Sequence, residues 1–362
     1  MDEHHNHNGG MGGHEGMGMN CDGTPPLGEG GTLIGHVLPG CLFVLWGSWW
    51  AYNACLRCAC SGPNGMGFRS RSWYALPGRW SLVEPVMKVV LPLLAVSMEL
   101  YFDHMSEGFQ YMYCPKGTKH EGEFAGDNLN NWQHAASYPA VILSGIIDLL
   151  SLVVEFPNGL THAFTSLVFG IMSFLMLLHE KHEALDKAVH WLLAVAMGLA
   201  FLFIVMEMKA KSSAVVSMGK GVSTIFVGAW LIQIGRYMYT DMPEWTKSKG
   251  LGAMMAPVFF CMTFLLICAC VTGLYVGLLL LVKMDLLPKS MRSTVPVLDT
   301  SLATTTGKQA LELAERKRLL SGKNTFDNDS ALCSSEGSPS QMHSLHIGYG
   351  FGHSRSSSDL NV

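Results

Sequence analysis

Histidines and carboxylates occur at a similar depth in several apolar stretches of this chain, although ionisable groups are costly inside a membrane. His36, His134 and His190 lie near the same expected end of three stretches, and Glu99 lies near that end of a fourth. Imidazole nitrogens and carboxylate oxygens that converge from neighbouring helices are ligands of zinc. The pattern predicts a metal site in the outer layer of a helix bundle, and an open fourth position there would activate water for hydrolysis. The competing interpretation places these histidines at the lipid headgroups, where they need no ligand.

A second set of polar residues lies deeper in the same stretches. It comprises Glu84, Lys88, Asp148, Glu207 and Gln233. Lys88 follows Glu84 by four residues, which is the favourable order for an ion pair on one face of a helix. This intramembrane polar network would either line a path for protons or ions or hold the helices together as structural ion pairs. The sequence leaves both interpretations open.

The stretches that carry these residues are long and apolar enough to cross a membrane. Hydrophobic residues make up 49% of the chain and charged residues 14%, and a spanning helix needs about 20 mostly apolar residues. We expect seven such helices, at 31–53, 83–102, 132–153, 160–178, 189–208, 222–239 and 256–282. A soluble fold would need further amphipathic helices to cover them. The sequence therefore predicts an all-α integral membrane protein, a seven-transmembrane-helix bundle that contacts the lipid bilayer and has no nucleic-acid partner.

Basic residues near the helix ends predict the orientation, because cytosolic loops are enriched in Lys and Arg. The first and fifth connections and the segment after the last helix are basic and fall on one side, with Arg57, Arg69, Arg71, Arg79, Lys209, Lys211, Lys220, Lys283, Lys289 and Arg292. We therefore expect the N-terminus outside or in a lumen and the C-terminus in the cytosol. Of the ten cysteines, only Cys21 and Cys114 then lie outside, so this orientation allows one disulfide.

Two tails flank the membrane domain, which gives three regions: a Met-, His- and Gly-rich tail at 1–30, the membrane domain at 31–282 and a Ser-rich cytosolic tail at 283–362. Both tails have the composition of disordered segments. The first tail contains "HHNH" and several methionines, and imidazole and thioether groups are copper ligands. Weak copper capture and a plain disordered tail are the two interpretations of this segment.

Two short motifs face the cytosol in this arrangement. The motif "CLRCAC" lies at the inner end of the first helix beside basic residues, where cysteines are typical palmitoylation sites, and metal ligation or unmodified thiols are the alternatives; its thiols are Cys55, Cys58 and Cys60. In the rear tail, "ERKRLL" resembles the acidic dileucine sorting signal that adaptor proteins bind, with Glu315, Leu319 and Leu320 as its defining residues.

Several motifs in a fixed order resemble the transmembrane protein 45 family, a group of multi-pass proteins of poorly defined biochemistry. They are "GHVLPG" at 35–40, "NWQHAASY" at 131–138, "SGIIDLL" at 144–150, "LDKAVHWLL" at 185–193, "AWLIQIG" at 229–235 and "PEW" at 243–245. The resemblance covers about residues 35–282 and implies seven helices in Golgi, endosomal, lysosomal or cell-surface membranes. It carries over no catalytic residue. The chain departs from the family pattern at "LLHEKHEALD", so the resemblance does not extend to His179 and His182 as ligands.

Three functions from different classes fit these observations. The first is a metal-dependent membrane protein, similar to a lipid hydrolase, with zinc in the outer layer. The second is a non-enzymatic trafficking or scaffold protein whose tail recruits adaptor proteins. The third is an ion or metal transporter with Lys88, Asp148 and Glu207 along its path. The sequence does not decide whether the protein is an enzyme.

Overall fold

The structure, a computed structural model, describes residues 19–24, 31–61, 67–76, 80–101, 108–179, 181, 183–287 and 315. Most of the two predicted tails therefore lies outside the described residues, including the "HHNH" segment and two residues of the sorting motif, Leu319 and Leu320. His182 also lies outside them.

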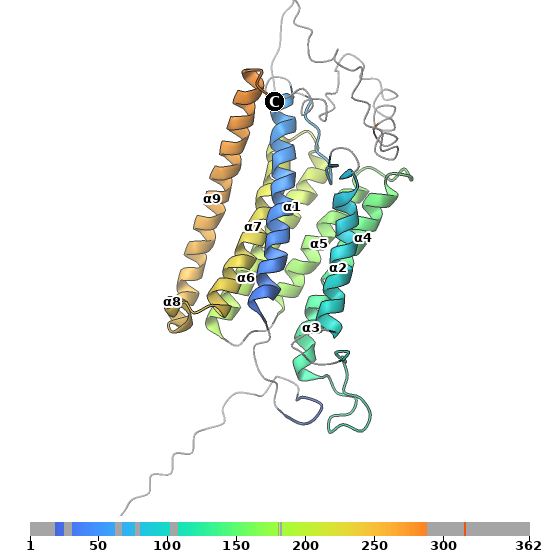
Figure 1. Cartoon of the computed structure of the whole chain (residues 1–362), viewed down its shortest axis with the longest axis vertical. Helices are drawn as coiled ribbons and strands as arrows, with labels where there is room; N and C mark the ends of the chain where they lie inside the picture. Colours follow the sequence, from blue (N-terminus) through green and yellow to red (C-terminus); the bar gives the residue numbers. More distant parts are fainter. Residues whose placement is uncertain are drawn as a thin grey trace, which may run out of the picture. The chain divides into compact units, whose positions relative to one another are not determined.

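Helices form over each of the expected apolar stretches (Figure 1). The long ones are α1 (Leu33–Cys60), α2 (Val83–Tyr101), α5 (Leu160–Leu177), α6 (Ala184–Lys209), α7 (Ala214–Tyr239) and α9 (Lys249–Lys283), and the shorter ones are η4 (Gly126–Asn128), α3 (Leu129–Ala135), α4 (Tyr138–Leu150) and α8 (Pro243–Thr246). Five of them, α1, α5, α6, α7 and α9, are long and apolar enough to cross a membrane by length and composition. The described residues thus support an all-helical membrane fold, and the expected count of seven spans goes beyond this finding.

The single helix expected over 132–153 was wrong, because this stretch forms two helices. Proline at position 139 stands at the start of α4 and has no amide hydrogen to donate to the carbonyl one turn earlier. The Ser137 hydroxyl instead donates to the carbonyl oxygen of His134 at 2.7 Å. The break separates α3, which carries His134, from α4, which carries Asp148.

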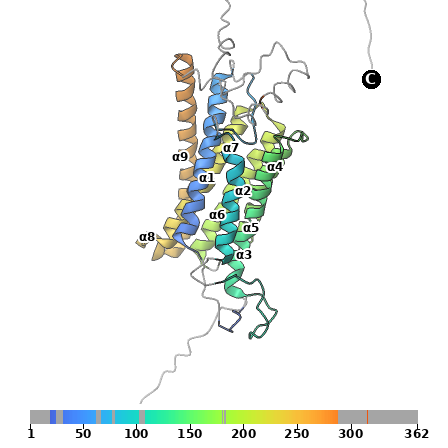
Figure 2. The ribbon, with the colours of Figure 1, turned by 45° about the vertical axis from the view of Figure 1, so that its right-hand side comes forward.

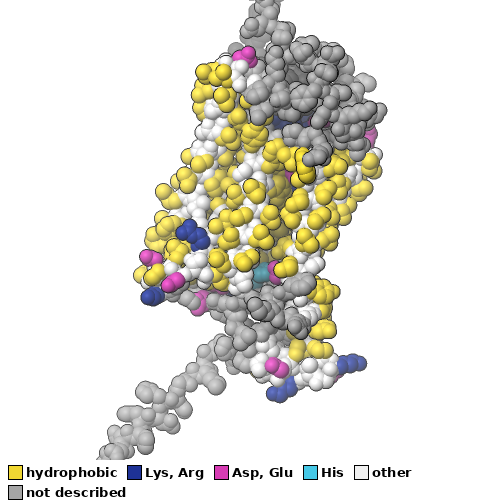
Figure 3. Space-filling view, viewed as in Figure 1, with side chains coloured by type: hydrophobic (Ala, Val, Ile, Leu, Met, Phe, Trp, Pro, Cys, Tyr) yellow, Lys and Arg dark blue, Asp and Glu magenta, His cyan; other side chains and the backbone are white. Residues whose placement is uncertain are grey.

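Helix α1 packs along α7, α5 along α6 and α2 along α4, and α9 lies against α1, α6 and α7. Figures 1 and 2 both show α9 at one edge of the bundle and α4 at the other. Glycines allow the close contact of α1 with α7, as in many membrane helix pairs. A Cβ atom on Gly47 would lie 2.5 Å from the backbone nitrogen of Ile225. Hydrophobic side chains cover most of the visible helix surface (Figure 3), as lipid contact requires.

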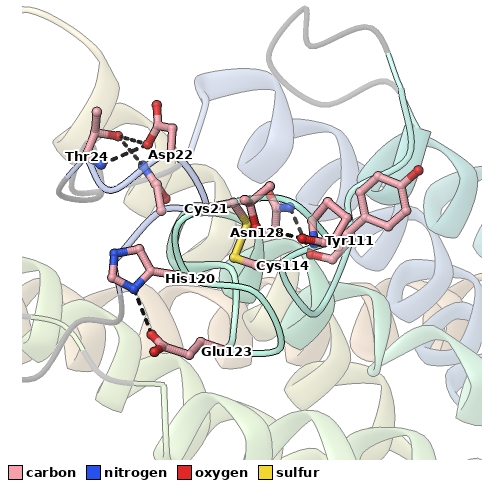
Figure 4. The surroundings of a disulfide bond; sticks show 11 residues. Cys21, Asp22, Thr24, Tyr111, Cys114, His120, Glu123 and Asn128 are labelled. Carbon is pink, nitrogen blue, oxygen red and sulfur yellow. Dashed lines mark hydrogen bonds and ion pairs between the residues drawn. A yellow bond between two sulfur atoms is a disulfide. The ribbon is translucent and has the colours of Figure 1, made fainter.

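A disulfide between Cys21 and Cys114 joins the segment before α1 to the connection between α2 and α3 (Figure 4). This is the bridge that the sequence allowed. Beside it, the Asp22 carboxylate accepts hydrogen bonds from the hydroxyl and the amide of Thr24, at 2.7 and 2.8 Å. These bonds lower the pKa of Asp22 below its usual 3.8. The bridge ties the N-terminal segment to the end of the bundle at which α1 begins and α2 ends, which we call the outer end.

Candidate functional site

A group of buried ionisable residues lies in the half of the bundle farther from this disulfide. We call it the inner cluster, and its members are Glu84, Lys88, Asp148, His162, Glu207 and Lys220. They come from five helices, α2, α4, α5, α6 and α7. Lys88 Nζ lies 2.7 Å from Asp148 Oδ2 and 3.5 Å from Glu84 Oε1. One ammonium group on α2 thus faces two carboxylates, one of them on α4.

Glu84 is held by three N–H donors in addition to Lys88. The indole nitrogens of Trp46 and Trp50 donate to its Oε1 at 3.0 and 2.8 Å, and the backbone amide of Tyr74 donates to its Oε2 at 3.0 Å. These hydrogen bonds connect Glu84 to α1 and to the segment before α2. Glu84 therefore anchors both of them to α2.

The second ion pair of the inner cluster joins α6 to α7. Lys220 Nζ lies 2.6 Å from Glu207 Oε2, and neither side chain is exposed to solvent. The same ammonium donates to the carbonyl oxygen of Arg71 at 2.7 Å. The ring of Trp50 connects the two ion pairs, because Lys220 Nζ and Lys88 Nζ lie 4.6 and 5.7 Å from its centre. Ammonium groups at such distances are attracted to the aromatic face.

The charges of the inner cluster do not balance. Its two ammonium groups face three carboxylates, so one negative charge is in excess while His162 is neutral. Glu207 has its own ammonium, and Glu84 has its N–H donors. Asp148 and Glu84 share the one ammonium group of Lys88, and the fully buried Asp148 keeps one oxygen, Oδ1, without a hydrogen-bond partner among the described residues. A buried charge that is only partly compensated is unfavourable, and Asp148 is therefore the group at which we place the binding of a proton or a cation.

His162 lies at the depth of Asp148. Ser144 on α4 and Thr165 on α5 are joined by a hydrogen bond of 3.3 Å, and these consecutive helices run in opposite directions. One turn further along α4 is Asp148, and one turn back along α5 is His162. Nε2 of His162 is 3.6 Å from Glu207 Oε2, and neither ring nitrogen has a hydrogen-bond partner among the described residues. His162 is thus a buried imidazole that faces Glu207 with Nε2.

Four histidines form a row across the outer end of the bundle, which we call the outer histidine row: His134, His179, His190 and His36 in spatial order. The ring centres are 5.6 Å apart from His134 to His179, 5.6 Å from His179 to His190 and 6.0 Å from His190 to His36. The predicted depth of His36, His134 and His190 agrees with this row. His179, which the resemblance set aside, lies at its centre.

Each imidazole in the row faces an oxygen atom of a different residue. His190 Nδ1 is 2.7 Å from Asp186 Oδ1, and His179 Nδ1 is 2.5 Å from Gln133 Oε1. His134 Nδ1 lies 3.7 Å from a Glu99 carboxylate oxygen, and His36 Nδ1 lies 3.0 Å from the carbonyl oxygen of Thr32. The partners are therefore distributed along the row, one to a ring, and do not converge on one point.

The predicted metal site finds no support in this geometry. Within the described part of the chain, no three His, Cys, Asp or Glu side chains are grouped so that they could hold a metal ion. Of the four predicted ligands, Glu99 approaches His134 only, and His36 meets His190 only as a neighbouring ring. Three of the four predicted ligands lie in one row of rings, but the rotation of each helix about its axis determines whether ligands converge.

The intramembrane network predicted from the sequence is present in part. Glu84, Lys88, Asp148 and Glu207 belong to the inner cluster, whereas Gln233 donates to Thr263 at 2.8 Å and accepts from Tyr237 at 2.9 Å, apart from the charges. Sequence reasoning missed Lys220 and His162. Lys220 was assigned to a basic connection, but α7 begins at Ala214 and buries it. The signal in the sequence was a lysine more than one turn inside an apolar helix, which needs a buried partner.

The remaining predicted sites lie on α1 and in the rear tail. Cys55 and Cys58 lie in the last turns of α1. Their thiols face α9, at 3.9 Å from the Val271 carbonyl oxygen and 3.8 Å from the Tyr275 hydroxyl. Cys60 is partly buried, and palmitoylation stays a prediction. Glu315 of the sorting motif forms an ion pair with Arg71.

Comparisons with known proteins bear on the second half of the bundle most directly. Residues 158–276 match the family described as "Family of unknown function (DUF716)". The chain is 24% identical over 258 residues to transmembrane epididymal protein 1A of Mus musculus. It is 23% identical over 260 residues to transmembrane epididymal protein 1 of Rattus norvegicus. Each comparison covers 68% of this chain and 80% of the relative. Together with the apolar helices, these similarities indicate an integral, multi-pass membrane protein.

Proposed function

We propose that this multi-pass membrane protein, similar in part to the DUF716 family, carries protons across its membrane through the interior of the bundle. The observation that supports the proposal is the excess carboxylate of the inner cluster. Asp148 is fully buried, and one of its oxygens has no partner among the described residues. Asp148 shares its only ammonium partner among the described residues, Lys88, with Glu84, and ionisable residues inside membrane bundles mark proton and ion paths.

The route that we propose runs along α4 and α5 to the outer end. The hydroxyl pair of Ser144 and Thr165 lies one turn beyond Asp148. From Ser144 to Tyr138 the distance along α4 is about 9 Å at 1.5 Å per residue, which water would have to bridge. The Tyr138 hydroxyl donates to Glu99 at 3.4 Å, and Glu99 adjoins His134 at one end of the outer histidine row.

We further propose that α2 and the α3–α4 pair complete seven spans and that the chain is of the transmembrane protein 45 type. The charges of α2 support a buried position for this helix, because Lys88 and Glu84 are only 4% and 7% exposed. The disulfide at the outer end supports an oxidising compartment there, and hence an N-terminus outside or in a lumen. The choice among Golgi, endosomal, lysosomal and cell-surface membranes stays a prediction.

A metal-dependent hydrolase is a weaker proposal than proton transfer. It would need three ligands around one ion, and the described residues supply no such group. A trafficking role depends on the rear tail, most of which lies outside the described residues. In both functions the buried charges of the inner cluster would serve only as structural ion pairs between helices.

The test is proton flux into liposomes that contain the purified full-length chain, a trapped pH-sensitive dye and a potassium diffusion potential. We expect flux with the unchanged chain, its loss with Asp148→Asn and its retention with Glu244→Gln, which alters an exposed carboxylate of α8. Circular dichroism and gel filtration confirm that the variants fold. Flux that equals the flux of protein-free liposomes, or that is unchanged by Asp148→Asn, would contradict the proposal.

A further inference from the structure

A basic hollow opens at the inner end of the bundle, at the ends of three connections. Its volume is about 520 Å³, and it is lined by Gly67, Phe68, Arg69, Asn158, Met208, Lys209, Lys211 and Ser212. These residues come from the α1–α2 connection, from the turn before α5 and from the end of α6 with the turn that follows. Three cationic side chains thus face one hollow, and none of the described residues that line it is acidic.

The hollow is built into the fold and does not depend on flexible side chains alone. The Ser70 amide donates to the Lys211 carbonyl oxygen at 2.8 Å and fastens the α1–α2 connection to the α6–α7 turn. Phe68 is buried beneath it. Arg69 and Lys209 are exposed, and neither forms an ion pair with a described residue. Their charges are therefore available to an anion.

Exposed apolar side chains occur close in the sequence to the residues that line the hollow. The loop before α5 exposes Val153 and Val154, and the first turn of α7 exposes Val215, which is 77% accessible. Val153 and Val154 precede Asn158 by five and four residues, and Val215 follows Ser212 by three, so these apolar side chains lie close along the chain to residues that line the hollow. Basic pockets at this depth on the cytosolic side of membrane proteins bind phosphate-bearing lipid headgroups.

We propose that this hollow binds the phosphate headgroup of an anionic phospholipid of the inner leaflet. Arg69, Lys209 and Lys211 contact the phosphate, Asn158 and Ser212 offer further N–H and O–H donors, and the acyl chains lie along the exposed valines. Arginine suits this role, because its planar group matches two phosphate oxygens. The inference is independent of proton transfer, since the inner cluster shares no residue with the hollow.

The experiment is native mass spectrometry of the full chain in detergent with equal amounts of phosphatidic acid and phosphatidylcholine. The test variant is Arg69→Gln/Lys209→Gln/Lys211→Gln. The matched control, Lys116→Gln/Lys187→Gln/Lys247→Gln, removes three exposed lysines elsewhere. We expect the unchanged chain and the control to prefer phosphatidic acid about tenfold, or about 1.4 kcal/mol, and the test variant to show no preference.

A further arm separates a lipid from a soluble anion. Inorganic phosphate at the concentration of the lipid should displace none of the bound phosphatidic acid. Full displacement by phosphate would overturn the lipid assignment, and an equal loss of preference in both triple variants would show general charge attraction in place of a site. An unchanged preference in the test variant would also overturn the proposal. If that variant does not fold, Lys209→Gln, at an exposed position, must still weaken the preference.

Discussion

Replacing Lys220 by Met removes the ammonium group that faces Glu207 and keeps a side chain of similar length. The two charged atoms lie 2.6 Å apart, and both side chains are fully buried. At an effective dielectric constant of about 20, their attraction is about 6 kcal/mol by Coulomb's law. The burial of two ions offsets much of this attraction, and removal of one partner from such a pair costs about 3–5 kcal/mol.

The prediction is therefore a coupling between the two positions. We expect Lys220→Met to lower the free energy of unfolding by about 3–5 kcal/mol, because the fully buried Glu207 loses its ammonium partner. Glu207→Gln should cost less, because the Arg71 carbonyl and the Trp50 ring still hold the Lys220 ammonium. The double variant, which leaves no unmatched charge at this pair, should be more stable than the sum of the two losses by at least about 2 kcal/mol.

The assay is unfolding of the purified chain in detergent, followed by circular dichroism while the fraction of denaturing detergent is raised. A double-mutant cycle gives the coupling from four proteins measured together. A matched cycle at Gln233 and Thr263, which share a neutral hydrogen bond, should give about 1 kcal/mol or less. Additive losses at Lys220 and Glu207, within about 0.5 kcal/mol, would refute the reasoning that the pair is a buried ion pair.

Three further predictions concern packing, the disulfide and the anchor of Glu84. Gly228→Ala should destabilise the chain by about 1–3 kcal/mol, because the new Cβ would meet the α1 backbone. The control, Gly277→Ala, should be neutral or stabilising in thermal melts, because no atom lies within 4 Å of the Cβ position. Equal melting temperatures of the two variants would contradict the contact between α1 and α7. Intact-mass measurement before and after reduction should show that Cys21 and Cys114 gain two hydrogen atoms together, and free thiols before reduction would count against the bridge. Trp50→Phe removes a donor to Glu84 and should cost about 1–3 kcal/mol; a loss of less than about 0.5 kcal/mol would show that the bond contributes little.

Apolar length predicted the helices well, because hydrocarbon-spanning segments must satisfy their own backbone hydrogen bonds. Their ends were harder to predict. Helix α1 continues to Cys60, seven residues past the apolar stretch, since hydrogen bonding continues after hydropathy falls. The same limit placed Lys220 in a connection although α7 buries it. From the sequence alone, a long basic side chain near the expected end of a helix is placed at the membrane interface, because its ion-pair partner inside the bundle is not known.

The sequence indicated which residues of the candidate site share one end of the bundle, but not the direction in which their side chains point. Sequence spacing placed His36, His134 and His190 in one layer, and the structure brings them into one row. Their partners depend on helix rotation, which depth does not reveal. The departure from the family pattern at "LLHEKHEALD" set His179 aside as a ligand, yet this ring lies between those of His134 and His190. Asp148 was predicted as part of a network, but only the structure shows that it shares Lys88 with Glu84. It also shows that Glu84 has further N–H donors from α1 and from the segment before α2.

The central claim is that Asp148 carries the excess charge of the inner cluster and binds a proton inside the bundle. Infrared difference spectroscopy between high and low pH tests it most directly, because a protonated carboxyl group has a carbonyl band that a carboxylate lacks. We predict such a band in the unchanged chain and in Glu244→Gln, and its loss in Asp148→Asn. A spectrum that is the same in all three proteins would contradict the claim.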